Sequence, residues 1–245
     1  MKAIIDADSF IYRSALNCEE LVQYDATHYG IQYNTSKGIE YLNNFIQETL
    51  EALNLKEYIL VVGGTGKNFR LDINPKYKSN RKQQKKPIML DIIRGIVFNE
   101  FPVAYIPRLE ADDTCRILVE EDKNNVLVSI DKDLRTFESK IYNPDKKDMR
   151  YVSKAQADIA FKKQLLTGDK CDGYDGLYWV GPKTAEKLLL DGITIEGILD
   201  LFLEKGYLQE DFERVYNCAK ILGKEDYRDG TITLYGGKTI KVTDN

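Results

Sequence analysis

Residues 1–8 read Met-Lys-Ala-Ile-Ile-Asp-Ala-Asp, a short apolar run that ends in two aspartates. Two further apolar runs, at residues 58–62 and 125–130, have the length and composition of strands buried on both faces. A stretch with helical spacing of apolar side chains, residues 36–53, lies between the first two runs. Strands that alternate with helices predict an α/β domain, with a mostly parallel sheet flanked by helices.

The pattern changes in the second half of the chain. Ser153-x-x-Gln156 has the spacing of a capping box, which opens a helix, and further short helical patterns follow it. Two alternating runs near the end of the sequence are separated by Gly236-Gly237, which predicts a β-hairpin with a two-residue turn. We therefore expect an α/β domain over residues 1–152, and a helical domain with a C-terminal β-hairpin over residues 153–245.

The composition is that of an ordered globular protein: 245 residues, of which 43% are hydrophobic and 30% charged. The four cysteines form no CxxC pair and there is one histidine, so a structural zinc site lacks ligands and reduced thiols are expected. Any catalysis must then use carboxylates, lysines, tyrosines or a metal ion.

The sequence has no apolar run of membrane-spanning length and no apolar stretch of a signal peptide, so we expect a cytoplasmic protein without membrane association.

Residues 67–86 carry eight basic residues and one acid, although the net charge of the whole chain is −4. Phe69 and Tyr77 lie among these basic residues, and Pro75 and Pro87 prevent one continuous helix. A basic segment with aromatics on an acidic protein predicts contact with a nucleic-acid backbone. The alternative is a solvated basic loop.

Acidic residues cluster where the predicted strands end. In an open α/β sheet, ligands bind at the carboxyl ends of the strands, so clusters that follow parallel strands converge on one edge. Carboxylates brought together in this way either have raised pKa values or hold divalent cations, and Mg²⁺ or Mn²⁺ suits so many oxygen ligands. Taken singly, each cluster is also explained as a helix cap or a turn. The clustered acids are Asp6 and Asp8; Glu110, Asp112 and Asp113; Asp131 and Asp133; and Asp169 and Asp172.

Shortly after the last acidic cluster comes Gly181-Pro182-Lys183-Thr184. Gly181 permits a tight turn, and Pro182 suits the first position of a helix whose free backbone N–H groups can bind a DNA phosphate. This pattern predicts a helix–hairpin–helix element. An ordinary packing turn between two helices is the alternative.

Taken in order, these motifs resemble those of the metal-dependent 5′→3′ exonucleases and flap endonucleases, and most of all the bacteriophage members of that family. The resemblance extends from residue 4 to about residue 190, and the last fifty residues have no clear counterpart. The matching stretches are Ile5–Asp8, Phe69-Arg70, Pro75–Arg81, Glu110–Asp113, Ser129–Asp133, Thr167–Gly176 and Gly181–Lys183. The family implies a PIN-like α/β domain followed by a helix–hairpin–helix domain.

The resemblance also implies two divalent metal ions, Mg²⁺ or Mn²⁺, with K⁺ as a further candidate ligand of the hairpin. The first metal site would use Asp6, Glu110 and Asp112, and the second Asp131, Asp133, Asp169 and Asp172, with Asp113 in support. Many relatives have another aspartate after the second strand, where this chain reads Gly63-Gly-Thr-Gly66. We expect Asp8 to compensate for that missing acid.

Roles in substrate binding follow from the same resemblance. Lys78 and Arg81 would be catalytic, steering and polarising the scissile phosphate, and Tyr77 could stack on a terminal base. Arg13 matches a position that contacts the 5′ end. The expected DNA-binding residues are Arg13, Arg70, Tyr77, Lys78, Arg81, Lys82, Gly181, Lys183 and Thr184.

The expected function is hydrolysis of phosphodiesters from the 5′ end of duplex, nicked or flapped DNA, and of RNA paired to DNA, by a monomer. The location would be the host cytoplasm if a phage encodes the chain. Two alternatives stay open. One is a structure-specific DNA-binding protein with weakened catalysis, because of the missing acid. The other is a phosphatase that forms an aspartyl-phosphate on the Asp6/Asp8 pair.

Overall fold

The computed structural model describes residues 1–79 and 85–243, and its centre is a twisted six-stranded sheet. All neighbouring strands are parallel except the last pair, β7 and β8, which is antiparallel. The predicted α/β class with a mostly parallel sheet is therefore confirmed. In spatial order the strands are β5 (Val103–Ala104), β4 (Tyr58–Val61), β1 (Ala3–Asp6), β6 (Val126–Val128), β7 (Ser139–Asn143) and β8 (Asp148–Val152).

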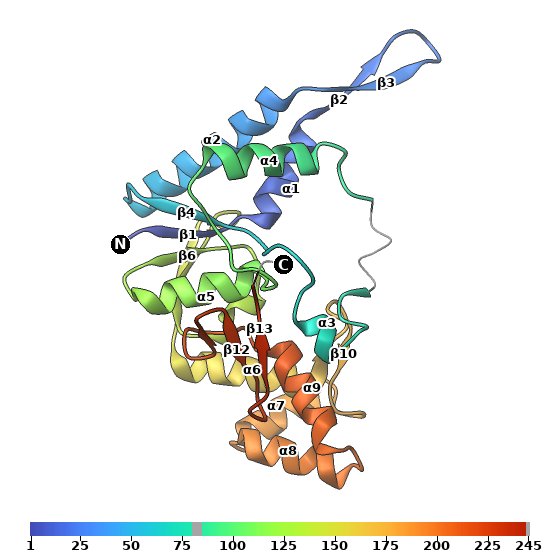
Figure 1. The fold of residues 1–245 in the computed structure, drawn as a ribbon, viewed down its shortest axis with the longest axis vertical. Coiled ribbons are helices and arrows are strands. Elements are labelled where there is room, and N and C mark those ends of the chain that lie inside the picture. The colour runs from blue at the N-terminus through green and yellow to red at the C-terminus, as the bar shows by residue number, and fades with distance from the viewer. Residues whose placement is uncertain (80–84, 244–245) are drawn as a thin grey trace.

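Helices cover both faces of this sheet (Figure 1). Because successive side chains of a strand point to opposite faces, Ala3 and Ile5 pack in one hydrophobic cluster and Ile4 in another. Leu42 and Ile93 fill the first cluster, and Cys115 belongs to the second. The first face is covered by α1 (Asp8–Asn17), α2 (Thr35–Leu53) and α4 (Leu90–Glu100), and the second by α5 (Ala111–Glu121) and the start of α6 (Lys154–Thr167).

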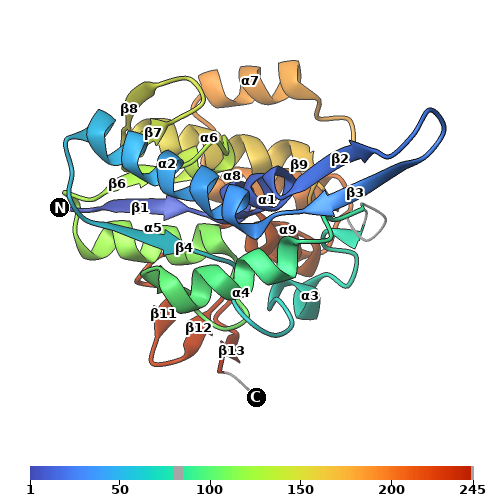
Figure 2. The same cartoon turned by 90° about the horizontal axis from the view of Figure 1, so that it is seen from above.

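The second half of the chain builds a helical unit around its own core, in which Phe202 and Phe212 are fully buried. Its elements are α6, β9 (Gly168–Asp169), β10 (Tyr174–Asp175), α7 (Pro182–Leu190), α8 (Ile195–Glu204) and α9 (Gln209–Ala219). The expected tail hairpin is present, formed by β12 (Thr231–Thr233) and β13 (Thr239–Lys241), with β11 (Tyr227–Arg228) as a third strand. Residues 234–238 connect β12 and β13, so the expected two-residue turn is wrong. Seen from above, this small sheet and α7 lie on opposite sides of the molecule (Figure 2).

The expected domain boundary at residue 152 falls between β8 and α6. Three hydrophobic clusters nevertheless contain residues from both sides of it, including the core of the helical unit, to which Tyr77 belongs. Ile221 packs with the second sheet face, and Leu222 and Ile232 share a cluster with Phe69. The segment that follows α9 thus returns to the first half of the chain and packs the two halves together.

One element was not expected from the sequence. Residues 23–30 suggest a polar loop, and residues 24–28 do form one, but this loop joins the strands of a projecting hairpin, β2 (Glu19–Gln23) and β3 (Tyr29–Tyr33), visible at the top of Figure 1. Asp25 Oδ1 accepts the amide N–H groups of Thr27 and His28 and so closes the turn. Two short elements complete the fold, α3 (Arg70–Ile73) and the 3₁₀ helix η2 (Asp133–Thr136).

No helix among residues 1–79 and 85–243 combines the length and the apolarity that crossing a bilayer requires.

Candidate active site

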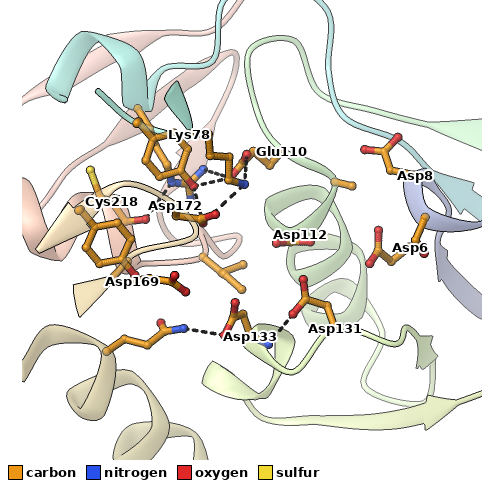
Figure 3. Close-up of a pocket in the computed structure, with 18 of the residues that line it drawn as sticks. Asp6, Asp8, Lys78, Glu110, Asp112, Asp131, Asp133, Asp169, Asp172 and Cys218 are labelled. Carbon is orange, nitrogen blue, oxygen red and sulfur yellow. Dashed lines mark hydrogen bonds and ion pairs between the residues drawn. The ribbon is translucent and has the colours of Figure 1, made fainter. Parts of the chain in front are cut away.

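A cavity of about 620 Å³ opens where the carboxyl ends of β1 and β6 meet α5, α6 and the β9–β10 hairpin. Of the nine acids predicted as metal ligands, all except Asp113 line it. Figure 3 shows them around one space. Those on the cavity wall are Asp6, Asp8, Glu110, Asp112, Asp131, Asp133, Asp169 and Asp172. Segments more than 160 residues apart in the sequence therefore bring their carboxylates together, as the strand-end argument predicts.

Asp6 is the last residue of β1 and is only 7% exposed. Its Oδ2 accepts a hydrogen bond of 2.8 Å from the Ser129 hydroxyl, which lies just beyond the neighbouring strand β6. Burial and the charges of Asp8 and Asp131 raise the pKa of Asp6 to about 7, and the Ser129 bond and Lys78 oppose that rise. A proton or a cation would relieve the cost of this buried charge.

Asp112 lies in the first turn of α5, next to Asp6 in Figure 3. Burial, followed by the charges of Asp6 and Glu110, raises its pKa well above the usual value. The opposing effect of Lys78 is smaller. The ionised forms of Asp6 and Asp112 are thus both disfavoured, mainly by burial.

Asp8, in the first turn of α1, accepts a hydrogen bond of 3.0 Å from the Gly63 N–H. A Cβ atom on Gly63 would lie 3.1 Å from Asp8 Oδ2, so this carboxylate lies where an acid at residue 63 would begin. Arg94 forms an ion pair of 3.6 Å with Asp8 and donates to the Gly63 carbonyl. Burial raises the pKa of Asp8, and Arg94 opposes that rise. This geometry is consistent with the compensating role expected for Asp8.

On the opposite side of the cavity the acids are already paired. Lys78 Nζ forms ion pairs with Glu110 and with Asp172, the latter at 3.6 Å. The Tyr77 hydroxyl lies 2.8 Å from Glu110 Oε2 and 3.1 Å from Asp172 Oδ2, so its one proton is shared between them. Burial alone would raise the pKa of Glu110, but the charges of Arg70 and Lys78 outweigh it and the pKa is lowered.

Asp131 and Asp133 form the floor of the cavity in Figure 3. Asp131 Oδ1 accepts the Asp133 N–H at 2.9 Å, and Asp133 accepts a hydrogen bond of 3.0 Å from Gln164 on α6. Burial, with the charges of Asp131 and Asp169, raises the pKa of Asp133 to about 6. Asp169 Oδ1 accepts the Cys171 N–H at 2.7 Å, which fixes the turn between β9 and β10.

Two predicted site residues prove to belong to the protein interior. Asp113 is fully buried and receives two hydrogen bonds, of 2.7 and 2.8 Å, from the Arg70 guanidinium. Arg70 is 2% exposed and also donates to the carbonyls of Cys218 and Lys220. Asp113 therefore does not line the cavity. Arg70 does line it, but the side chain is buried and its guanidinium is held by Asp113 and two backbone carbonyls, which is not the exposed position expected of a DNA contact. The hydrogen bonds of this pair connect α3, α5 and the C-terminal end of α9.

The burial of Tyr77 likewise corrects the expectation that its ring stacks on a terminal base. The side chain is 4% exposed, and its hydroxyl is held by Glu110 and Asp172. Lys78 does line the cavity as predicted. The predicted Arg81 and Lys82 lie outside the described residues.

Arg13 lines the cavity at its other edge, on α1. Its guanidinium makes two hydrogen bonds, of 2.7 and 2.6 Å, to Asp145 in the β7–β8 turn. Asp145, Ser129, Gln164 and Arg94 had no functional assignment from the sequence. Only Ser129 offered a signal, because it stands two residues before Asp131; the other three make their contacts across long distances in sequence.

The predicted hairpin residues lie away from the cavity wall. Gly181 is the N-cap of α7, Pro182 is at its first position, and Lys183 and Thr184 follow in the first turn. All four are exposed, and the first backbone N–H groups of a helix have no partner within the helix. The local structure is therefore the one that the Gly-Pro-Lys pattern predicts.

The donor atoms of the cavity suit hard divalent cations. Carboxylate oxygens are preferred by Mg²⁺ and Mn²⁺, and the raised pKa values of Asp6 and Asp112 reflect charge that a cation would compensate. Within the described part of the chain, no three acidic, His or Cys side chains are close enough to form a ready-made metal site.

Comparison with known proteins agrees with this geometry. The family described as "5′-3′ exonuclease, N-terminal resolvase-like domain" matches residues 2–163. A 5′-3′ exonuclease of Aquifex aeolicus is 28% identical over 251 residues, covering 91% of this chain and 77% of that protein. An exodeoxyribonuclease of Enterobacteria phage T3 is 31% identical over 138 residues, covering 51% of this chain and 44% of the phage protein.

The fold has a solved counterpart in the flap endonuclease of bacteriophage T5, in a structure that contains DNA and metal ions. The TM-score is 0.65 with 17% sequence identity, over 89% of this chain and 87% of the T5 chain. At that identity the likeness concerns the fold. The family match covers the sheet and six of the eight acids of the cavity, and from it we conclude that the chain belongs to the 5′-3′ exonuclease family, whose relatives include phage exonucleases and flap endonucleases.

Proposed function

We propose that this protein is a divalent-metal-dependent nuclease that hydrolyses phosphodiesters from the 5′ end of duplex, nicked or flapped DNA. The observation that carries the proposal is the convergence of eight carboxylates, from four separate segments, on one cavity. The family supports the same conclusion, because its members are named for 5′-3′ exonuclease activity. The T5 relative, whose structure holds DNA and metal ions, supports DNA as the substrate class.

Two Mg²⁺ or Mn²⁺ ions, when bound, would activate a water and stabilise the leaving 3′ oxygen, as pairs of ions about 3.5–4 Å apart do. Asp6, Glu110 and Asp112 would hold one of them, with Asp8 nearby. The residues that would hold the other are Asp131, Asp133, Asp169 and Asp172. Ser129 keeps the Asp6 carboxylate oriented toward the cavity by its 2.8 Å hydrogen bond.

Positive side chains on the cavity wall supply the phosphate contacts. Lys78 is within reach of both Glu110 and Asp172, so its ammonium lies at the mouth of the proposed metal site. Arg13 presents a planar fork that matches a phosphate as well as it matches the Asp145 carboxylate. By the family resemblance, Arg81 and Lys82 are further proposed phosphate contacts. Gly181, Lys183 and Thr184 bind a duplex phosphate farther from the cleavage point.

The proposal includes RNA paired to DNA as a substrate and a monomer as the active form. A 5′-labelled nicked duplex, a matching RNA–DNA hybrid and a single strand, each incubated with Mg²⁺, Mn²⁺ or EDTA, test the substrate class. We expect cleavage from the 5′ end that EDTA removes. Hydrolysis of a small phosphomonoester, with all three nucleic acids left intact, would favour the phosphatase alternative instead.

Asp131→Asn is the sharpest variant for this proposal. The asparagine keeps an oxygen for the Asp133 N–H but loses the charge, so we expect cleavage to be abolished and DNA binding to persist. Asp91→Asn is the matched control, because Asp91 is an exposed acid in the first turn of α4. Cleavage by Asp131→Asn at the wild-type rate would contradict the assignment.

A further inference from the structure

The tight turn between β10 and α7 carries two exposed aromatic side chains. The Val180 N–H donates to the Leu177 carbonyl at 3.1 Å, which closes a four-residue turn with Tyr178 and Trp179 at its corners. Tyr178 is 65% exposed and Trp179 is 80% exposed. Their rings meet edge to face, with centroids 4.5 Å apart and an angle of 63°.

Trp179 has a backbone conformation that disfavours it. Its φ is +69°, the left-handed region, at the turn position where glycine is the usual residue. A bulky side chain at such a position costs free energy, and an indole that is 80% exposed recovers little of it by burial. Fold stability therefore gives no reason for a tryptophan here.

The residues around this corner hold it rigidly. Leu177 is 4% exposed, and its N–H donates to the Leu166 carbonyl at 2.9 Å. The Tyr178 N–H donates to the Tyr207 hydroxyl at 3.3 Å. A Cβ atom on Gly176 would lie 2.4 Å from the Gly168 nitrogen, so the two chains touch backbone to backbone. The aromatic pair is thus displayed on a fixed support.

The aromatic pair lies between the two proposed nucleic-acid contacts in the sequence, the cavity wall and the start of α7. Tyr174, on the cavity wall, is five residues before Trp179, and a chain of that length spans roughly 18 Å at most. Lys183, exposed in the first turn of α7, is four residues after it and within roughly 14 Å. Lys187, also exposed, adds a second positive charge to the same helix.

We propose that Trp179 and Tyr178 form an aromatic contact for the duplex part of the nucleic-acid substrate, against its sugars and base faces, while Lys183 binds a neighbouring phosphate. This inference rests on the proposed function, since it takes DNA to be the substrate. The occupant follows from charge and chemistry: exposed aromatic rings beside lysines and free helix N–H groups suit an anionic polymer with flat apolar faces. Because Trp179 lies outside the cavity lining, the contact is with nucleotides away from the reacting phosphate.

The chain supplies its own probe for this contact, because Trp179 is its one tryptophan. The full chain is titrated with a nicked duplex in EDTA, so that no cleavage occurs, and tryptophan emission is followed. We expect DNA to change the emission and to protect the indole from quenching by acrylamide. Unchanged emission and quenching, under conditions where a labelled duplex is bound, would overturn the inference.

Variants give the second measurement. Trp179→Ala should weaken binding of the nicked duplex about tenfold, and Trp179→Phe should keep most of the affinity. Trp179→Gly should lose affinity like the alanine variant while its Tm stays equal to that of the wild type or rises, because glycine relieves the left-handed φ. Leu190→Ala is the control, since Leu190 is 87% exposed at the far end of the same helix.

The outcomes separate this inference from the proposed function. If the wild type binds and cleaves DNA but Trp179→Ala binds as tightly as Leu190→Ala, the aromatic contact is wrong and the nuclease assignment stands. If the wild type neither binds nor cleaves DNA, both are wrong. Loss of affinity in Trp179→Ala and Trp179→Gly, with folding intact, supports the contact.

Discussion

The two sides of the cavity carry the same kind of side chain in opposite electrostatic conditions. On the sheet side, burial raises the pKa of Asp6 to about 7 and that of Asp112 well above its usual value. On the opposite side Glu110 is also buried, but Arg70 and Lys78 lower its pKa. Figure 3 shows this division, with Asp6 and Asp8 on one side and Lys78, Glu110 and Asp172 on the other.

The difference shows that burial alone does not decide the state of these acids. Their protonation state is decided by the position of the cations, because the Arg70 guanidinium and the Lys78 ammonium both form ion pairs with Glu110. On the sheet side, the described cationic side chains compensate the charges of Asp6 and Asp112 less well. We therefore expect ion binding to matter most for Asp6 and Asp112, and loss of protein cations to matter most for Glu110.

Within this comparison of the two sides of the cavity, the largest effect is expected for Asp112→Asn. Removing a proposed ligand should lower the single-turnover cleavage rate by roughly a thousandfold. The same change should raise the Tm of the metal-free protein, because a buried carboxylate under repulsion is replaced by a neutral amide. Rapid-quench kinetics and scanning calorimetry measure the two effects.

Glu110→Gln is the matched variant from the other side of the cavity. It should lower the Tm, because Lys78 and Arg70 each lose an anionic partner. If both substitutions shift the Tm in the same direction, the contrast between the two sides is wrong. Asp91→Asn, on the exposed start of α4, should change neither quantity.

A smaller effect is expected for Lys78→Ala. The variant loses a positive charge at the cavity mouth, so binding and rate should both fall, the rate by about a hundredfold. The slope of log binding constant against log salt should flatten by about one ion. Lys56→Ala, on an exposed lysine just before β4, is the control, and an identical salt slope in both variants would rule out a phosphate contact by Lys78.

The smallest effect concerns the pH dependence of stability in metal-free protein. The pKa of Asp6 is about 7 when folded and 3.8 as an unperturbed group, so the folded state binds the proton more tightly. Its contribution to stability is full below about pH 4 and is lost as the pH rises through about 7. Asp6→Asn removes this loss and should raise the Tm relative to wild type by about 5 °C more at pH 8 than at pH 5.

Thermal unfolding in EDTA at both pH values makes this measurement. The asparagine oxygen can still accept the hydrogen bond from the Ser129 hydroxyl, so this bond is kept in both proteins and does not contribute to the Tm difference. An equal Tm difference at the two pH values would mean that the Asp6 pKa is not raised. In a parallel experiment with Mg²⁺ in place of EDTA, the Tm of the wild type should no longer fall between pH 5 and pH 8. The reason is that a bound cation favours the ionised carboxylate.

Much of the site was predictable because it depends on local patterns. Apolar runs that end in acids gave the strands β1 and β6 and the positions of Asp6 and Asp131. The capping pattern of Ser153 and Gln156 opens α6 as expected, and the structure contains that capping box. The parallel order of the strands then brought the acids to one edge, as the general rule for such sheets requires.

Other features could not be predicted, because they depend on contacts between residues far apart in the sequence. Arg70 belongs to a segment rich in lysine and arginine, and only the packing of α3 against α5 and α9 turns it inward to Asp113. Tyr77 is buried for the same reason. Arg13 and Asp145 pair across 132 positions of sequence.

The sequence by itself determined the class of fold, the family and the acids that meet at the sheet edge, because period-two and helical patterns and strand ends are local properties of the chain. Tertiary structure alone decided which charged side chains face the cavity and which form ion pairs in the protein interior. It also decided that Trp179 would be held outward in a left-handed turn, because the backbone contacts that fix this turn come from Gly168 and Leu166, about ten residues away in the sequence.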